Sequence, residues 1–366
     1  MNKPRLLVVA PFPPPVHGAA MMSLAVRDSK RLQARFRMDC INLSTSRRVD
    51  EIRQMSFRKI LRLAGALGQT CYRLLFRRYD VCYLAITCYG VGFLKDAPFV
   101  ALCKLFGKKV VLHQHNKGMS RYVHRKPYRW LLPWIYRHTS VMLLSWKLYP
   151  DVEAVVRKEQ VLICPNGIPS LPLGPWERKE TDAPVRMLFL SNLIESKGVY
   201  ILLDACRILK EKGYRLVCDV VGGEGETITC ALFEDEIRQR GLEGTVLYHG
   251  PQYGADKERF WREADLFVQP TYEDCFPLTL LEAMQHALPI VSTDEGAIPD
   301  MVIDGINGFV CKRKNVDSFV NAIEKLLNDK QLRKQMGKNG RLRYQERYTL
   351  EAFDKRLEEL LSGLLN

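Results

Sequence analysis

Short apolar runs alternating with longer segments of helical period limit most strongly how this chain can fold. The runs are rich in Val, Ile and Leu. Strands of that composition, separated by helices, form parallel sheets with both faces covered. The sequence therefore predicts an α/β protein with doubly wound sheets. The strand candidates are residues 5–10, 81–86, 109–113, 140–144, 160–164, 186–190, 215–221, 245–248, 266–269 and 289–293.

One proline-rich stretch interrupts this alternation. Three prolines and a run of charged residues lie within residues 169–182. Proline at this density continues neither a helix nor a central strand, and a chain of 366 residues exceeds the size at which one core keeps growing. We therefore predict domains over residues 1–168 and 183–349 with a linker over 169–182. Two such domains in series form a central cleft at the carboxyl ends of their strands, where doubly wound sheets bind ligands.

The net charge of +14 is unevenly divided along the chain. Residues 1–180 carry 31 Lys and Arg against 11 Asp and Glu, whereas residues 181–366 carry 24 against 30. A basic first half indicates an anionic partner, which is a nucleic acid, an acidic membrane surface or a phosphorylated substrate. A solvated surface explains a net charge, but it explains this segregation less well.

Residues 57–75 combine an apolar stripe with a basic flank. A helix of this pattern either packs its stripe on the domain core or lies on an anionic interface. Both hold if the helix packs on the sheet and shows its basic rim to lipid. The stripe is Phe57, Ile60, Leu61, Ala64, Leu67, Cys71, Leu74 and Leu75, and the flank is Arg58, Lys59, Arg62, Arg73, Arg77 and Arg78.

Cysteine usage and hydropathy limit where in the cell the protein is expected. The 11 Cys are scattered, without C-x-x-C or metal-like spacing, which is typical of reduced thiols in the cytosol. No stretch approaches the roughly 20 apolar residues of a spanning helix. We therefore expect a cytoplasmic protein, associated peripherally with the inner face of the cell membrane.

Three glycine-bearing turns follow predicted strands. They lie at Gly18, at Ser191–Gly198 and at Val221–Gly225. The small residues at Gly18–Ala20 let backbone N–H groups approach a ligand at a helix N-terminus, where anions are favoured. None of these turns matches a P-loop, and each alone is also compatible with a plain strand–helix connection.

The segment Pro270–Met284 carries the strongest signal for chemistry. Glu273 and Asp274 follow a predicted strand, and a helix is expected from about Pro277, which suits a first helical turn. The N–H groups of Leu278–Leu280 can bind a phosphate or sugar hydroxyls.

Asp274 and Glu282 are separated by seven residues, and Ala283-Met284 follows. The helix dipole favours acids in a first turn, but that explanation covers one acid rather than this spaced pair. The segment resembles the E-x7-E motif of the retaining glycosyltransferases of family 4, which have the GT-B fold of two Rossmann-like domains. Supporting matches are the Gly18 loop, Pro165-Asn166-Gly167-Ile168, Lys197-Gly198, Glu295-Gly296 and the last helix, 350–365.

The resemblance implies a role for each domain and for three side chains. The first domain binds the acceptor, the second binds the nucleotide sugar, and helix 350–365 crosses back to the first. Glu282 holds the donor ribose hydroxyls, and Lys197 neutralises the leaving diphosphate. Asp274 faces the donor sugar; it is one methylene shorter than the family's Glu, which leaves Glu273 as a candidate to share its role.

The sequence departs from the family at Asn192, where an Arg is usual. Either another Arg compensates, or the leaving group depends more on helix N-termini. His115 is similar to the family's first-domain active-site histidine, whereas His113 is better explained as structural. Gly250-Pro251 is similar to the segment that contacts the base.

The residues implied as catalytic are His115, Lys197 and Asp274. No Asp-x-Asp occurs, so positive groups rather than Mg²⁺ are expected to stabilise the diphosphate, with no cofactor beyond the co-substrate. The donor-binding residues are expected to be Gly18, Asn192, Lys197, Gly250, Pro251, Glu273, Asp274, Phe276, Leu278, Thr279, Leu280 and Glu282.

The function that the resemblance implies is transfer of a hexose, with retention, from a nucleotide sugar to a glycan acceptor. A lipid-linked acceptor in bacterial surface polysaccharide synthesis fits the basic first half. A nucleotide-sugar epimerase or a phosphorylase of the same fold is the alternative. A nucleic-acid-binding protein should interleave basic and exposed aromatic residues, which the chain does only slightly at Arg121-Tyr122 and Tyr128-Arg129-Trp130; no nucleic-acid partner is expected.

Overall fold

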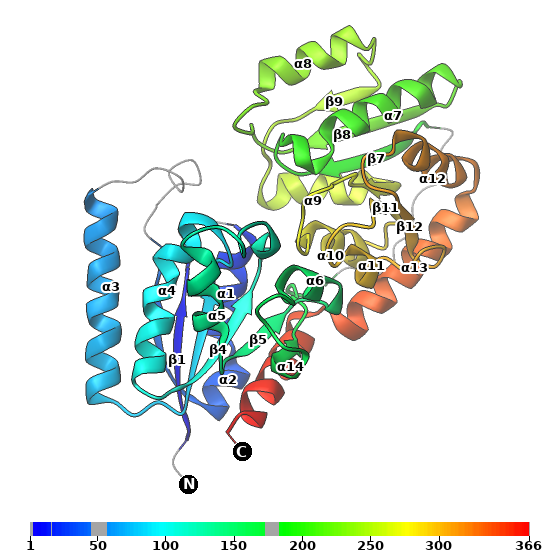
Figure 1. Cartoon of the computed structure of the whole chain (residues 1–366). Coiled ribbons are helices and arrows are strands. Elements are labelled where there is room, and N and C mark those ends of the chain that lie inside the picture. The colour runs from blue at the N-terminus through cyan, green and yellow to red at the C-terminus, as the bar shows by residue number, and fades with distance from the viewer. Residues whose placement is uncertain (1–2, 16, 45–56, 173–182, 366) are drawn as a thin grey trace. The chain divides into compact units, whose positions relative to one another are not determined.

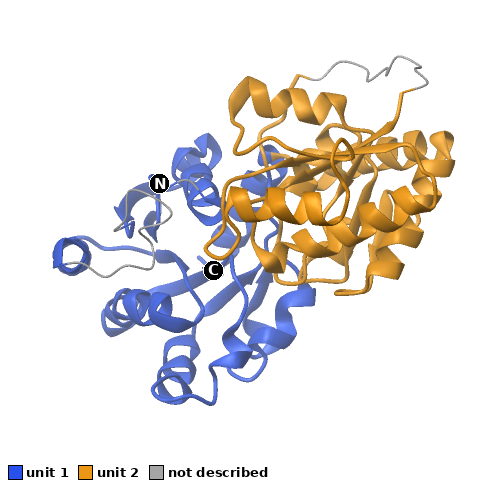
Figure 2. Ribbon diagram, turned by 90° about the horizontal axis from the view of Figure 1, so that it is seen from above, with its two compact units in different colours: residues 1–167, 350–366 blue, residues 168–349 orange. Residues whose placement is uncertain are grey.

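A computed structural model describes residues 3–15, 17–44, 57–172 and 183–365 (Figure 1). The chain divides into two compact units, coloured blue and orange in Figure 2. Unit 1 comprises residues 1–167 and 350–366, and unit 2 comprises residues 168–349. Residues 173–182 of the predicted linker lie outside the described residues. Within the described part of the chain, no helix has the length and hydropathy needed to cross a membrane.

Unit 1 is built on a six-stranded parallel sheet of order β2-β1-β3-β4-β5-β6. The strands are β1 (Arg5–Ala10), β2 (Arg37–Asn42), β3 (Val81–Ile86), β4 (Lys109–Gln114), β5 (Ser140–Leu143) and β6 (Val161–Ile163). The helices are α1 (Gly18–Asp28), α2 (Lys30–Arg35), α3 (Phe57–Phe76), α4 (Gly90–Leu105), α5 (Tyr128–Tyr136), α6 (Tyr149–Val152) and α14 (Leu350–Gly363), with 3₁₀ turns η1 (Met119–Arg121), η2 (Trp146–Leu148) and η3 (Lys158–Gln160).

The core of unit 1 lies on both faces of this sheet. Successive strand residues point to opposite faces, so Leu6 and Val8 enter one cluster while Leu7 and Val9 enter the other. The first cluster also holds Phe353 of α14, and the second holds residues of α4 and α5. A strand buried on both faces must be apolar throughout, which explains the unbroken hydrophobic run of β1.

Unit 2 repeats this plan with a parallel sheet of order β12-β11-β10-β7-β8-β9. The strands are β7 (Val185–Leu190), β8 (Leu216–Val221), β9 (Val246–Tyr248), β10 (Leu266–Val268), β11 (Ile290–Thr293) and β12 (Gly308–Cys311). The helices are η4 (Glu195–Lys197), α7 (Val199–Glu211), α8 (Cys230–Gln239), α9 (Gly254–Glu263), α10 (Leu278–Gln285), α11 (Ile298–Met301), α12 (Val316–Asn328) and α13 (Lys330–Arg347). The predicted α/β class with two doubly wound parallel sheets is confirmed.

Two edge strands, β2 and β12, were missing from the prediction. The ten predicted strands are all present, and their ends differ from the prediction by at most one residue. Both missed strands pair with only one neighbour and are partly exposed. An edge strand needs no continuous apolar run, so β2 with its polar Arg37, Asp39 and Asn42 gave no hydrophobic signal.

The strand orders place one switch point in each sheet. The order reverses between β1 and β3 in unit 1 and between β7 and β10 in unit 2. The loops after such strands are where doubly wound sheets bind ligands. In unit 2 these loops, together with the helix α10 (Leu278–Gln285) that follows β10, contain most of the predicted site residues.

Candidate functional site

The loops that follow β7 and β10 are joined at the switch point of unit 2. The Tyr272 N–H and the Thr271 hydroxyl both donate to the Ser196 carbonyl, at 2.9 and 3.1 Å. The Tyr272 hydroxyl donates to Glu195 at 3.0 Å. Burial and this carboxylate raise the pKa of Tyr272 to about 12. These bonds hold the two loops in one arrangement.

An ion pair between Lys197 and Asp274 connects the same two loops. The Lys197 ammonium donates to Oδ2 of Asp274, and both side chains are largely buried. The next residue, Gly198, has a φ of +86°, and a Cβ there would lie 2.1 Å from the Pro270 carbonyl oxygen. Glycine is therefore required where the loops cross, and this close approach brings Lys197 within reach of Asp274.

The loop after β11 contacts the backbone of Asp274. Glu295, which is fully buried, accepts the Asp274 N–H on Oε1 at 3.1 Å and Nη1 of Arg313 on Oε2 at 2.7 Å. A buried carboxylate is stable only when it is paired in this way. Gly296 allows the contact, because a Cβ there would lie 2.3 Å from the Asp274 carbonyl oxygen.

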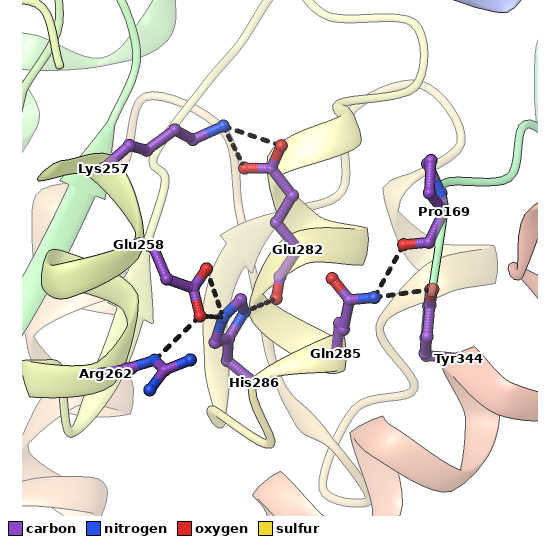
Figure 3. Close-up of polar contacts among 8 residues, drawn as sticks. All are labelled: Pro169, Lys257, Glu258, Arg262, Glu282, Gln285, His286 and Tyr344. Carbon is purple, nitrogen blue, oxygen red and sulfur yellow. Dashed lines mark hydrogen bonds and ion pairs between the residues drawn. The ribbon is translucent and has the colours of Figure 1, made fainter. Parts of the chain in front are cut away.

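Glu282 lies on α10 and is bridged by Lys257 of α9, as Figure 3 shows. The Lys257 ammonium lies 2.8 Å from Oε1 and 2.7 Å from Oε2. About a quarter of each side chain remains exposed, 28% for Lys257 and 25% for Glu282. The carboxylate is therefore fixed in orientation, with Oε2 buried and part of the side chain still exposed.

The end of α10 is fixed on both sides. His286 Nδ1 donates to the Glu282 carbonyl at 2.8 Å, and its Nε2 lies 3.1 Å from the Glu258 carboxylate (Figure 3). Gln285 donates to the Pro169 carbonyl at 2.9 Å. These contacts leave the Glu282 backbone little freedom.

The turns after β8 and β9 lie beside Asn192. The Asn192 side-chain carbonyl accepts the Gly223 N–H at 3.1 Å, and the Gly222 N–H donates to the Gly250 carbonyl at 2.9 Å. A Cβ on Gly223 would lie 3.9 Å from Pro251. Asn192 therefore holds the glycine turn next to the segment that the resemblance assigns to the base.

The first turn of α10 differs in part from its expected role. Pro277 stands at the N-cap and has no side-chain oxygen to cap the helix, but the Leu280 N–H already donates to the Pro277 carbonyl at 3.2 Å. The Leu280 side chain is fully buried, and Phe276 is buried against the ring of Tyr348. Leu278 and Thr279 are thus better placed than Leu280 to donate backbone hydrogen bonds to a ligand. Phe276 is better explained as a structural residue. Glu273 is exposed.

The remaining candidates, Gly18 and His115, lie in unit 1. α1 begins at Gly18, and its N-cap residue His17 accepts the Ala20 N–H on Nδ1 at 3.4 Å. Burial lowers the pKa of His115 to about 4, against an opposing effect of Asn166, so the imidazole is neutral at pH 7. His113 is fully buried, and its Nδ1 lies 2.6 Å from the Tyr83 hydroxyl, which is a structural arrangement.

Three charged residues to which sequence reasoning gave no site role support this site. Lys257 contacts Glu282, Glu295 accepts the Asp274 N–H, and Arg313 pairs with Glu295. Glu295 was visible only within the family match Glu295-Gly296, whereas no periodicity or short motif marks Lys257 or Arg313, because only the tertiary fold brings them there. Within the described ranges, no group of three or more His, Cys, Asp or Glu side chains is arranged to hold a metal ion.

A family comparison agrees with the geometry of unit 2. Residues 175–343 match the family model described as "Glycosyl transferases group 1". The matched residues make up most of unit 2 but less than half of the chain, so unit 2 is similar to domains of that family.

Relatives and solved structures extend the comparison. The chain is 26% identical over 177 residues to the capsular polysaccharide biosynthesis glycosyltransferase CapM of Staphylococcus aureus, which covers 48% of this chain and 46% of that protein. It is 26% identical over 192 residues to N,N'-diacetylbacillosaminyl-diphospho-undecaprenol alpha-1,3-N-acetylgalactosaminyltransferase of Campylobacter jejuni, covering 52% and 48%. The chain thus spans about half the length of these curated relatives.

The likeness to solved structures covers nearly the whole chain. Anabaena Alr3699/HepE, crystallised in complex with UDP, matches with a TM-score of 0.75 at 18% identity over 98% of this chain and 100% of that one. At this identity the comparison shows a shared fold, which is the GT-B fold.

Proposed function

We propose that the protein is a metal-independent, retaining glycosyltransferase of family 4 that moves a hexose from a nucleotide sugar to a lipid-linked glycan. The observation that carries this proposal is the Lys197–Asp274 ion pair at the switch point of unit 2. It fixes a cation and a carboxylate side by side at the strand ends where doubly wound sheets bind ligands. Glu282 follows on the adjoining helix.

The chemistry expected there is stabilisation of a leaving group. As the bond between sugar and diphosphate breaks, negative charge grows on the diphosphate, and fixed positive groups lower the barrier. A lysine ammonium has three N–H donors. Asp274 accepts from Lys197, so donors remain for phosphate oxygens. The N–H groups in the first turn of α10 are further hydrogen-bond donors to the diphosphate.

Glu282 is suited to hold the ribose. An ionised carboxylate accepts about four hydrogen bonds; Lys257 donates to Oε1 and forms an ion pair with Oε2, which accepts no hydrogen bond from the described residues. The other positions can accept from a vicinal diol. The turn around Gly223, Gly250 and Pro251 offers backbone groups to the base.

The acceptor is assigned to unit 1. A neutral His115 can exchange hydrogen bonds with sugar hydroxyls without adding charge. In the retaining reaction we propose, the acceptor hydroxyl attacks from the face that the diphosphate leaves, and the diphosphate takes its proton. The names of the relatives, which mention capsular polysaccharide and a diphospho-undecaprenol sugar, support a lipid-linked acceptor at the inner face of a cell membrane, reached from the cytoplasm. No nucleic-acid partner is proposed.

Thermal unfolding with a panel of UDP-, GDP- and other nucleotide sugars tests the donor. A ligand at 100 times its Kd stabilises the folded protein by about 2.7 kcal/mol, so one donor should raise the Tm clearly. Transfer to a soluble acceptor should then show a product with the donor's anomeric configuration. Conversion of the donor sugar without any acceptor would instead identify an epimerase, and no stabilisation by any nucleotide sugar would contradict the proposal.

A further inference from the structure

Helix α3 of unit 1 turns its apolar stripe away from the unit. Thr70 and Leu74 are its buried residues, and Leu63, Ala66 and Leu67 pack partly against the core. On the opposite side, Phe57 and Phe76 are 73% and 72% exposed. The expectation that the stripe packs into the core is therefore wrong for much of it. The exposed large apolar side chains of α3 are Phe57, Ile60, Leu61, Tyr72, Leu75 and Phe76.

These side chains lie on one side of the helix, in a group near each end. Residues three or four apart share a helix face, and the series Phe57, Leu61, Ala64, Gly68, Tyr72 and Leu75 follows that spacing. The rings of Tyr72 and Phe76 lie 4.8 Å apart at one end. In Figure 1, α3 stands beside α4 at the outer edge of unit 1. Large apolar side chains exposed together on one side of a helix mark an interaction site.

The charge around this surface identifies what it contacts. From Phe57 to Tyr79 the sequence contains six Lys and Arg but no Asp or Glu. Arg77 is compensated by Asp39 at 2.8 Å, whereas Arg58 and Arg78 are exposed. A second copy of the helix would set arginine against arginine. An anionic, partly apolar surface complements both the charge and the stripe.

We propose that α3 lies in the plane of an anionic lipid leaflet, with Phe57, Leu61, Leu75 and Phe76 between the acyl chains and its arginines at the lipid phosphates. This inference deepens the proposed membrane location by naming its surface, and it does not depend on the transfer reaction. It also revises the expected binding mode. Charge alone gives binding that salt abolishes, whereas buried apolar side chains give a component that salt does not remove.

Co-sedimentation with phosphatidylglycerol–phosphatidylcholine vesicles at low and high salt tests this. The test variant is Phe57→Ser/Leu61→Ser/Leu75→Ser in the full chain. The control is Val91→Ser/Leu105→Ser, which removes apolar side chains that are 68% and 75% exposed on α4 of the same unit.

The wild type should pellet at low salt and remain partly bound at high salt. At high salt the test variant should bind the vesicles at least about tenfold more weakly than the wild type, because it loses its inserted side chains. The control variant should bind as the wild type does. Arg58→Gln/Arg78→Gln should weaken binding at low salt only.

Three results would overturn the proposal. The first is wild-type binding that high salt abolishes completely, and the second is high-salt binding that the test variant retains in full. The third is a wild-type dimer in sedimentation equilibrium that the test variant dissociates, which would assign the surface to a second copy. Unfolding curves verify that the variants fold. Transfer to a soluble acceptor should be unchanged in the test variant, so failure of the membrane inference and failure of the transferase proposal are distinguishable.

Discussion

Lys257 of α9 holds both carboxylate oxygens of Glu282, at 2.8 and 2.7 Å. The bridge sets the direction in which the carboxylate faces before any ligand arrives. It also balances the charge of a side chain that is three-quarters buried. Lys257 is therefore a positioning residue for Glu282 rather than a group that needs to touch the substrate.

Glu282→Ala should lower kcat/KM for the nucleotide sugar by about 10- to 100-fold, because hydrogen bonds from the ribose to a charged group are lost. Lys257→Ala should raise the donor KM with kcat nearly unchanged, since it disturbs orientation only. Steady-state kinetics with varied donor separates the two. Wild-type kinetics in a folded Glu282→Ala variant would contradict the ribose assignment.

Lys197→Ala should lower kcat by roughly two orders of magnitude, because a fixed donor aimed at developing negative charge contributes about 3 kcal/mol. Single-turnover rates at saturating donor measure this. Lys210→Ala, which removes a lysine exposed on α7, is the control. A change in KM alone would make Lys197 a ground-state binder.

Transfer should continue in excess EDTA. The proposed mechanism stabilises the diphosphate with Lys197 and the α10 N-terminus, which a chelator does not remove. Initial rates with EDTA, and then with added Mg²⁺ or Mn²⁺, check this. Abolition by EDTA with recovery on metal addition would contradict metal independence.

The stability of unit 1 should fall as the pH drops below about 6.5. Burial lowers the pKa of His115 to about 4, so between these values the unfolded chain binds a proton that the folded chain does not. Linkage predicts a loss of about 2 kcal/mol between pH 7 and pH 5 from this residue. Urea midpoints at the two pH values should differ less in His115→Gln than in the wild type, while His124→Gln, at an exposed histidine, keeps the full difference. An equal difference in all three proteins would rule the effect out.

Gly198→Ala should destabilise unit 2 by about 3 kcal/mol, because the new methyl group meets the Pro270 carbonyl and the residue keeps a positive φ. Gly213→Ala is a matched control. Its φ is +84° and nothing lies within 4 Å of its Cβ position, so it measures the backbone cost alone, about 1 kcal/mol. Urea unfolding of both variants separates the clash from the strain, and equal losses would contradict the crossing geometry.

The sequence predicted the parts of the fold that depend on burial. β1 is apolar throughout because both of its faces are covered, so its run of residues 5–10 was visible without tertiary information. β2 is an edge strand with polar residues, and its existence depends on pairing with β1. Nothing local in its composition requires that pairing.

Some residues of the candidate site could likewise be predicted from the sequence and others could not. Asp274 and Glu282 are close in sequence and lie on one loop and helix, so their spacing was informative. Lys257 and Glu295 act on them from separate elements; Lys257 has no local signature, and Glu295 was visible only within the family match Glu295-Gly296. The orientation of α3 was also undecided, because a helical period shows that a stripe exists but not which side of the helix the sheet covers.

The packing of α14 constrains the order in which the protein can mature during synthesis. Phe353, Leu357 and Leu361 are fully buried in the same core as Leu6 and Val8. A ribosome that has translated the N-terminal segment has therefore produced a sheet with one face covered only in part, by residues of α1 and α2. Unit 2, which is continuous in sequence, can fold first, while the blue unit of Figure 2 waits for the final helix. A nascent chain that stalls before Leu350 would expose the part of that apolar face that α14 covers to chaperones and proteases, so quality control can distinguish chains with α14 from chains without it.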